Sequence, residues 1–189
     1  MKKLLVLFAL SATVLHAQAA PQAPPQNPEY EGLWEGYDGE WGHVSRQLIA
    51  LAEAIPADKY SWRPGPGVRS VSEVLMHIAQ ANFELLSVTG PKMPPDMDKD
   101  DLEKTVTSKP AVIAALERSL DAVKTARAQL KPGDLERKVT FVGKTVTVDG
   151  MYLRIIVHDN EHMGQLVAYA RINGIVPPWS RQPGPASNK

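Results

Sequence analysis

The sequence predicts an all-α protein, a four-helix bundle with a small β-hairpin between the third and fourth helices. Four long segments carry apolar residues every three or four positions, which is the period of an amphipathic helix. One short β-branched stretch is divided by Gly143-Lys144, a pair typical of a two-residue hairpin turn. One hairpin is too small to form a sheet domain, so the helices must supply the core.

The first two helices are expected over residues 30–55 and from Ser70 onward. Apolar side chains mark one face of the first segment at steps of three or four residues. Ser70 and Glu73 have the spacing of a capping box, which opens the second helix, and a Gly-Pro pair closes it. The Pro- and Asp-rich residues 91–101 follow and are expected to form an exposed loop with solvated charges.

The second half of the chain is expected to contain two more helices. The third fits residues 110–130, and Lys131-Pro132-Gly133 stops it. The hairpin follows, and the fourth helix then runs from Asp149 to about Ile172. We expect one bundle domain over residues 29–178 and a flexible tail over 179–189.

The first 28 residues are expected to lie outside the fold. A short basic start, a twelve-residue apolar run and Ala17-Gln18-Ala19 predict a signal peptide over residues 1–19. The apolar run is too short for a spanning helix, so no stable membrane insertion is expected after cleavage. Residues 20–28 are Pro-rich and predict a linker. The mature protein is therefore expected to be exported, to a periplasmic or extracellular space.

Composition excludes several classes of function. The 21 basic and 21 acidic residues balance, and no basic cluster stands out, so nucleic acid is not expected as a partner. The chain has no cysteine, which excludes disulfides, thiolate metal sites and a cysteine nucleophile. Any metal must therefore be bound by His, Asp or Glu.

Three histidines are the candidate metal ligands. His158 and His162 are one turn apart on the inward stripe of the fourth helix, where two imidazoles can converge on one ion. His77 borders the apolar face of the second helix and could supply a third nitrogen. An inward histidine is also common as a core residue with one hydrogen bond, but a shared divalent ion would satisfy all three. His43 is out of phase with its apolar neighbours and is expected at the surface.

Other residues on these stripes are weaker candidates. Glu84 follows His77 by seven residues and could act as a catalytic base or orient a ligand, or be an ordinary surface carboxylate. Gln165 and Tyr169 continue the histidine stripe and could line a pocket. Arg154 could meet an anionic substrate, although a solvated charge is the simpler expectation.

Two apparent motifs are rejected. The stretch from His158 to His162 spells HxxEH, the inverted zinc-protease motif, but no Asp or Glu occurs after Glu161 to complete that site. Gly143-Lys144-Thr145 imitates the end of a phosphate-binding loop, but position 138 is Lys where that motif requires Gly.

The motifs around these histidines resemble the DinB-like superfamily. The similarity lies in Tyr60-Ser61-Trp62-Arg63-Pro64, in residues 68–79, in residues 158–166 and in Asn173-Gly174, and it spans nearly all of the mature chain. The resemblance implies a DinB/YfiT-like four-helix bundle in which His77, His158 and His162 hold a divalent metal. Relatives include S-transferases that use bacillithiol or mycothiol and a maleylpyruvate isomerase that uses mycothiol. Relatives are often dimers, so a homodimer is one assembly that the resemblance implies.

Three functions remain open at this point. The first is an exported metalloenzyme, a transferase of thiols or other groups or a hydrolase, acting on a small molecule that could be a thiol. The second is a noncatalytic metal-binding or metal-stabilised protein, and the third is a helical interaction module with buried histidines. Three histidines accommodate zinc, nickel, iron or copper, with zinc or nickel the leading expectation.

Overall fold

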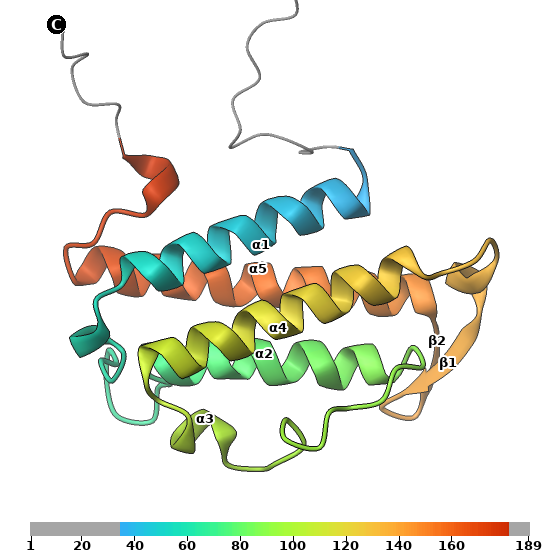
Figure 1. The fold of residues 1–189 in the computed structure, drawn as a ribbon, viewed down its shortest axis with the longest axis horizontal. Coiled ribbons are helices and arrows are strands. Elements are labelled where there is room, and N and C mark those ends of the chain that lie inside the picture. The colour runs from blue at the N-terminus through green and yellow to red at the C-terminus, as the bar shows by residue number, and fades with distance from the viewer. Residues whose placement is uncertain (1–34, 182–189) are drawn as a thin grey trace, which may run out of the picture.

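The computed structural model describes residues 35–181, and within them four long α-helices pack as a bundle (Figure 1). This confirms the predicted fold class, with a two-stranded antiparallel hairpin between the last two long helices. None of the helices in 35–181 combines the length and apolar character needed to cross a bilayer. The long helices are α1 (Tyr37–Ala54), α2 (Val71–Ser87), α4 (Lys109–Ala128) and α5 (Val148–Ile172); α3 (Leu102–Thr105) is one turn.

Each long helix packs mainly against two others, α2 and α1 both lying against α4 and α5. Figure 1 shows that α1 and α5 run one way along the bundle and α2 and α4 the other way. The start of α4 accordingly meets the end of α1, where Lys109 Nζ donates to the carbonyls of Glu53 and Ile55. Because α2 and α4 are parallel, the segment between them must return along the bundle, and it carries α3 against α2.

The apolar stripes that the sequence predicts form the core. On α1, the five apolar residues from Trp41 to Ile55 in the predicted stripe are all buried, as are Val74 and Ile78 on α2. Ile172 continues the steps of three and four residues that link His158, His162, Gln165 and Tyr169 on α5, but it is 67% exposed and lies outside the core. A stripe repeating every 3.5 residues drifts by about 20° per heptad on a 3.6-residue helix, so its last member has left the core.

Two of the long helices, α2 and α5, begin within one residue of the predicted start, and each has a side-chain cap. The Ser70 hydroxyl accepts from Glu73 N, and the Glu73 carboxylate accepts from Ser70 N, which forms the expected capping box. On α5, the Thr147 hydroxyl accepts from Gly150 N. The first helix begins at Tyr37, so residues 35 and 36 of its expected span are not helical, and residues 30–34 of that span lie outside the described range, as do the expected signal peptide (1–19) and linker (20–28).

The hairpin turn lies one residue earlier than predicted. Strand β1 (Lys138–Phe141) pairs with β2 (Lys144–Thr147), and Phe141 is opposite Lys144. The turn is therefore Val142-Gly143, not Gly143-Lys144. Both residues have positive φ, 46° and 68°, as a right-handed hairpin twist requires of a two-residue turn.

Two segments expected to be exposed contribute to the core. In the expected loop 91–101, Met97 is buried, and α3 follows it although no local pattern predicted a helix there. Trp179, which we expected in the tail, belongs to a short 3₁₀ helix (Pro178–Ser180) and packs on the core. Residues 182–189 of the expected tail lie outside the described range.

Candidate metal centre

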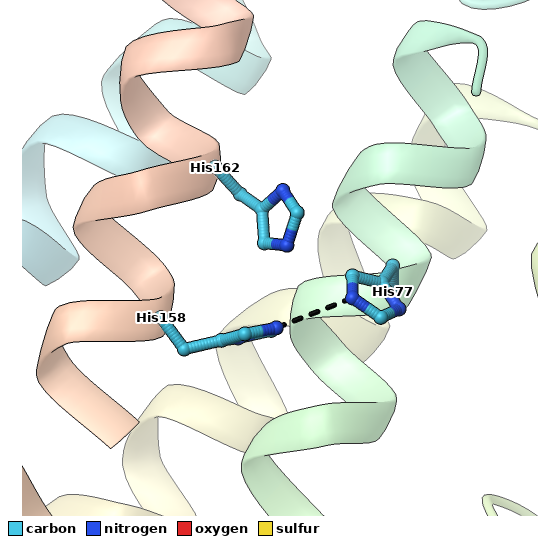
Figure 2. A group of neighbouring side chains, drawn as sticks. All are labelled: His77, His158 and His162. Carbon is cyan, nitrogen blue, oxygen red and sulfur yellow. Dashed lines mark hydrogen bonds between the residues drawn. The ribbon is translucent and has the colours of Figure 1, made fainter. Parts of the chain in front are cut away.

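Three histidines from two adjacent helices meet inside the bundle. His77 comes from the middle of α2, and His158 and His162 come from successive turns of α5. Figure 2 shows the three side chains pointing toward one another across the gap between the helices. Their ring centroids are 4.6–5.0 Å apart, so the fold brings together the residues that the sequence singled out.

The spacing of the ring nitrogens suits a metal ion. One nitrogen from each ring lies within 4.8 Å of the others, and His158 Nε2 is 3.2 Å from His77 Nε2. Two nitrogen ligands of a tetrahedral zinc ion lie roughly 3.3 Å apart, because each Zn–N bond is about 2.0–2.1 Å. The donor set and its spacing therefore fit a divalent ion of the zinc type.

Glu103 orients His77. The Glu103 carboxylate lies 2.9 Å from His77 Nδ1 and also accepts two hydrogen bonds from the Arg69 guanidinium. A carboxylate can only accept at neutral pH, so this contact places the His77 proton on Nδ1 and leaves Nε2 free to bind an ion. The sequence analysis missed Glu103, which lies 26 residues from His77 on α3 and belongs to a run of acidic residues without helical phase.

A hydrogen-bond chain orients His162 in the same way. His162 Nδ1 lies 2.9 Å from Gln165 Oε1, Gln165 Nε2 donates to the Tyr169 hydroxyl, and that hydroxyl donates to the Arg69 carbonyl. Because the Gln165 amide oxygen can only accept, this chain of hydrogen bonds places the His162 proton on Nδ1 and leaves Nε2 free to bind an ion. Gln165 and Tyr169, which the sequence offered as residues that could line a pocket, form the hydrogen-bond chain behind a candidate ligand.

Burial favours the neutral form of all three imidazoles. Burial lowers the pKa of His77, His158 and His162 below the ordinary value, because desolvation disfavours the charged ring. Arginine charges add to this, Arg69 for His77 and Arg154 for His158. A neutral ring is the form that binds metal, so no histidine has to lose a proton near pH 7.

Comparison with known proteins places this fold in a family. The sequence model of the DinB superfamily matches residues 40–166, which is more than half of the chain. The chain belongs to the DinB superfamily. It is similar in fold to the crystal structure of a DinB-like protein from Bacillus cereus ATCC 10987, with a TM-score of 0.67 and 22% identity over 77% of this chain and 95% of that one.

A second solved DinB-like protein, from Bacillus subtilis, is also similar in fold. Its TM-score is 0.60 and its identity 21%, over 78% of this chain and 99% of the other. No curated protein matches this DinB-superfamily chain. The comparisons therefore establish the family and the fold.

A cavity of about 580 Å³ opens beside His77 of this DinB-superfamily protein. It lies between α2 and the segment that returns to α4, with His77 and Glu103 in its wall. Glu84, the candidate base, lines the same cavity and is exposed, and its negative charge acts to raise the pKa of His158 against the larger effect of burial. The remaining lining residues are Gln80, Ala81, Ser87, Met93, Met97, Asp98, Lys99 and Asp100.

The other sequence candidates lie outside the cluster. His43 is half-buried on α1 and does not join the three-histidine group. Arg154 Nη2 and Glu161 Oε2 lie 3.4 Å apart on the outer face of α5 and both side chains are exposed, which agrees with the expectation of a solvated charge at Arg154.

Proposed function

We propose that this protein binds one divalent metal ion through His77, His158 and His162. The observation that carries the proposal is the convergence of three imidazoles whose ligand nitrogens lie within 4.8 Å of one another. Two of the three have Nδ1 held by Glu103 or Gln165, so that Nε2 is aimed inward. Zinc or nickel is the first expectation, and iron or copper also suits three imidazoles.

We further propose that the site serves a metal-dependent enzyme of the transferase or hydrolase type. Three neutral ligands leave the ion its full charge and open coordination positions, at which a bound water or thiol becomes more acidic. The cavity beside His77 is large enough for a small-molecule substrate, and a thiol is the first class to test. Glu84 lines that cavity and remains the candidate catalytic base.

A noncatalytic, metal-stabilised protein is the alternative. It is favoured by the distribution of the ligands, since one comes from α2 and two from α5. An ion bound there cross-links two helices and stabilises only the folded chain, by RT ln(1 + [L]/Kd) for free metal at concentration [L]. Such a role requires no substrate.

Metal content per chain tests the common part of both proposals. The protein is purified without chelators and its metal is measured by elemental analysis. We expect about one divalent ion per chain in the wild type, close to none in His77→Ala or His158→Ala, and an unchanged content in His43→Ala, the matched control outside the cluster. A wild type that stays metal-free after reloading would leave only the helical interaction module.

Activity of the metal-loaded protein then separates enzyme from metal-stabilised protein. It is screened with thiols paired with electrophiles and with ester and amide panels. An enzyme is expected to turn over one of these and to lose activity in Glu84→Gln while keeping its metal. A metal-dependent rise in melting temperature with silence in every screen would favour the alternative.

Export is proposed on the leader sequence alone. The three-part pattern of residues 1–19 supports cleavage after Ala19 and a periplasmic or extracellular mature protein. Expression in a Gram-negative host, followed by fractionation and intact mass, tests this. A chain beginning at Ala20 in the periplasm is expected, and an uncleaved cytoplasmic chain would contradict it.

A further inference from the structure

Behind His158 lies a group of buried polar side chains that the proposed metal site does not use. Asp159 on α5, Asn82 on α2 and Ser119 on α4 are each 0% exposed. Asn82 Nδ2 lies 3.3 Å from both Asp159 Oδ2 and Ser119 Oγ, and the Ser119 hydroxyl donates to the Leu116 carbonyl. This group therefore joins three helices in the middle of the bundle.

Three buried atoms in this group have no hydrogen-bond partner among the described residues. They are His158 Nδ1, Asp159 Oδ1 and Asn82 Oδ1. His158 Nδ1 and Asp159 Oδ1 lie 3.9 Å apart, too far for a direct hydrogen bond but within the span of one small displacement or one water molecule. A single water that accepts from the nitrogen and donates to Asp159 Oδ1 would satisfy both of these atoms.

The other two histidines show what is missing at His158. His77 Nδ1 faces the Glu103 carboxylate and His162 Nδ1 faces the Gln165 amide oxygen. A metal-binding histidine with a free Nε2 has its proton on Nδ1 and needs an acceptor there. Asp159 Oδ1 is an unpaired acceptor close to His158 Nδ1, and it is held from behind by Asn82.

We propose that Asp159 is the positioning residue for His158. Resting on the proposed metal site, it accepts the Nδ1–H hydrogen bond of His158, directly or across one buried water, and so aims Nε2 at the ion. Asn82 holds Asp159 through its amide, and Ser119 holds Asn82. Each of the three histidines then has its own acceptor: Glu103 on α3 for His77, Gln165 on α5 for His162, and Asp159 on α5 for His158.

A purely structural role for Asp159 makes a different prediction. If the carboxyl only links α5 to α2, its replacement should change the stability of the metal-free protein and leave metal affinity alone. A positioning role should change the affinity and the ligand field of the ion. The two roles are separated by measuring metal binding and metal-free unfolding on the same variants.

The test compares Asp159→Asn with the exchange variant Asn82→Asp/Asp159→Asn in the mature chain. The exchange keeps one carboxyl and one amide in the core but moves the carboxyl to α2. The control is Asp149→Asn, the same substitution at an exposed position of the same helix. Zinc affinity is measured by competition with a chromophoric chelator, Co²⁺ absorption reports the ligand field, and urea unfolding with EDTA reports metal-free stability.

We expect Asp159→Asn to weaken zinc binding by about 10- to 100-fold and to shift the Co²⁺ bands. The exchange variant should stay weakened, and Asp149→Asn should match the wild type. Affinities within twofold of the wild type in Asp159→Asn, or full recovery in the exchange variant, would overturn the assignment.

Two further outcomes are also decisive. If Asp159→Asn does not fold, Asn82→Ser tests the same support, with weaker zinc binding expected and unchanged binding contradicting the proposal. Failure of the wild type itself to bind zinc or cobalt would overturn the proposed metal site and this inference with it, whereas wild-type binding with an indifferent Asp159→Asn overturns only the inference.

Discussion

At the scale of single residues, the candidate centre depends on what lies behind each imidazole. Glu103 supports His77 and Gln165 supports His162, each at 2.9 Å from Nδ1. Such contacts fix which nitrogen carries the proton and which can bind an ion. A three-histidine pattern in a sequence gives the ligands but says nothing of these partners.

Glu103→Gln is expected to weaken metal binding. The amide oxygen can still accept from His77 Nδ1–H, but the negative charge and the ion pair with Arg69 are lost, so the ring becomes a poorer ligand. We expect a loss of affinity of about tenfold in a chelator competition. Glu84→Gln, the same substitution on the same cavity wall, is the control and should bind like the wild type. Equal affinities for both variants would show that Glu103 has no role in binding.

Metal-free stability is expected to depend on pH through the buried histidines. Their pKa values are lowered from 6.5 by burial, so between these values and 6.5 the unfolded chain binds more protons than the folded one. The stabilisation that the neutral buried histidines give the metal-free fold is therefore complete above pH 6.5 and is lost as the pH falls below it. For each histidine the free energy of unfolding falls by no more than about 1.4 kcal/mol per pH unit.

The contribution of Asp159 to stability changes with pH in the opposite direction, so it must be measured separately from that of the histidines. Burial raises its pKa from 3.8 to about 8, so its contribution is present below pH 3.8 and is lost as pH rises toward 8. Urea unfolding with EDTA at pH 5.5 and 7.0 should therefore show a steeper gain of stability with pH in Asp159→Asn than in the wild type. A gain that is the same or smaller in the variant would contradict these directions.

At the scale of elements, local sequence rules account for most helix ends and fail at the hairpin. The capping box opens α2 where it was expected, because its two hydrogen bonds involve only residues 70 and 73. The turn is displaced by one residue because strand register depends on the pairing across the hairpin. The pairing of Phe141 with Lys144 leaves Val142, a β-branched residue, at φ 46°.

Val142→Asn is expected to stabilise the protein. A β-branched side chain in the left-handed region is strained, whereas Asn-Gly is the preferred pair for this type of turn. Val142 is 81% exposed, so its replacement removes little apolar packing. We expect a gain of about 1 kcal/mol in the free energy of unfolding, measured in urea. Gly143→Ala, at φ 68°, should lower stability in the same assay. A destabilised Val142→Asn would show that Val142 is not a source of backbone strain.

At the scale of the whole molecule, helix direction determines how the centre is completed. α2 and α4 are parallel neighbours, so the chain must return along the bundle between them, and this return places α3 beside α2 (Figure 1). Glu103 reaches His77 only because of that path. An up-down-up-down bundle with a short connection at this point would have no residue there.

Leu102→Ala tests this dependence. Leu102 is the buried residue of α3, so its truncation should loosen α3 and lower metal affinity toward that of Glu103→Gln. Leu120→Ala, at a buried position of α4 away from the histidines, is the matched control. Each should lose about 2–5 kcal/mol of stability in urea, but only Leu102→Ala should also bind zinc more weakly. Equal zinc affinities in Leu102→Ala and Leu120→Ala would show that the position of Glu103 does not depend on the packing of Leu102.

The sequence by itself determined the four helices, the capping box of α2 and the three histidines, because each follows from residues within a few turns of one another. His158 and His162 share a helix face by spacing alone, and His77 lies on the stripe that an amphipathic helix buries. Only the tertiary structure decided that His77 faces the other two, that Glu103 and Gln165 support them, and that Oδ1 of Asp159 lies behind His158 without a hydrogen-bond partner. These relations depend on how the helices pack and in which direction they run. The spacing of apolar residues within one helix carries no information about either.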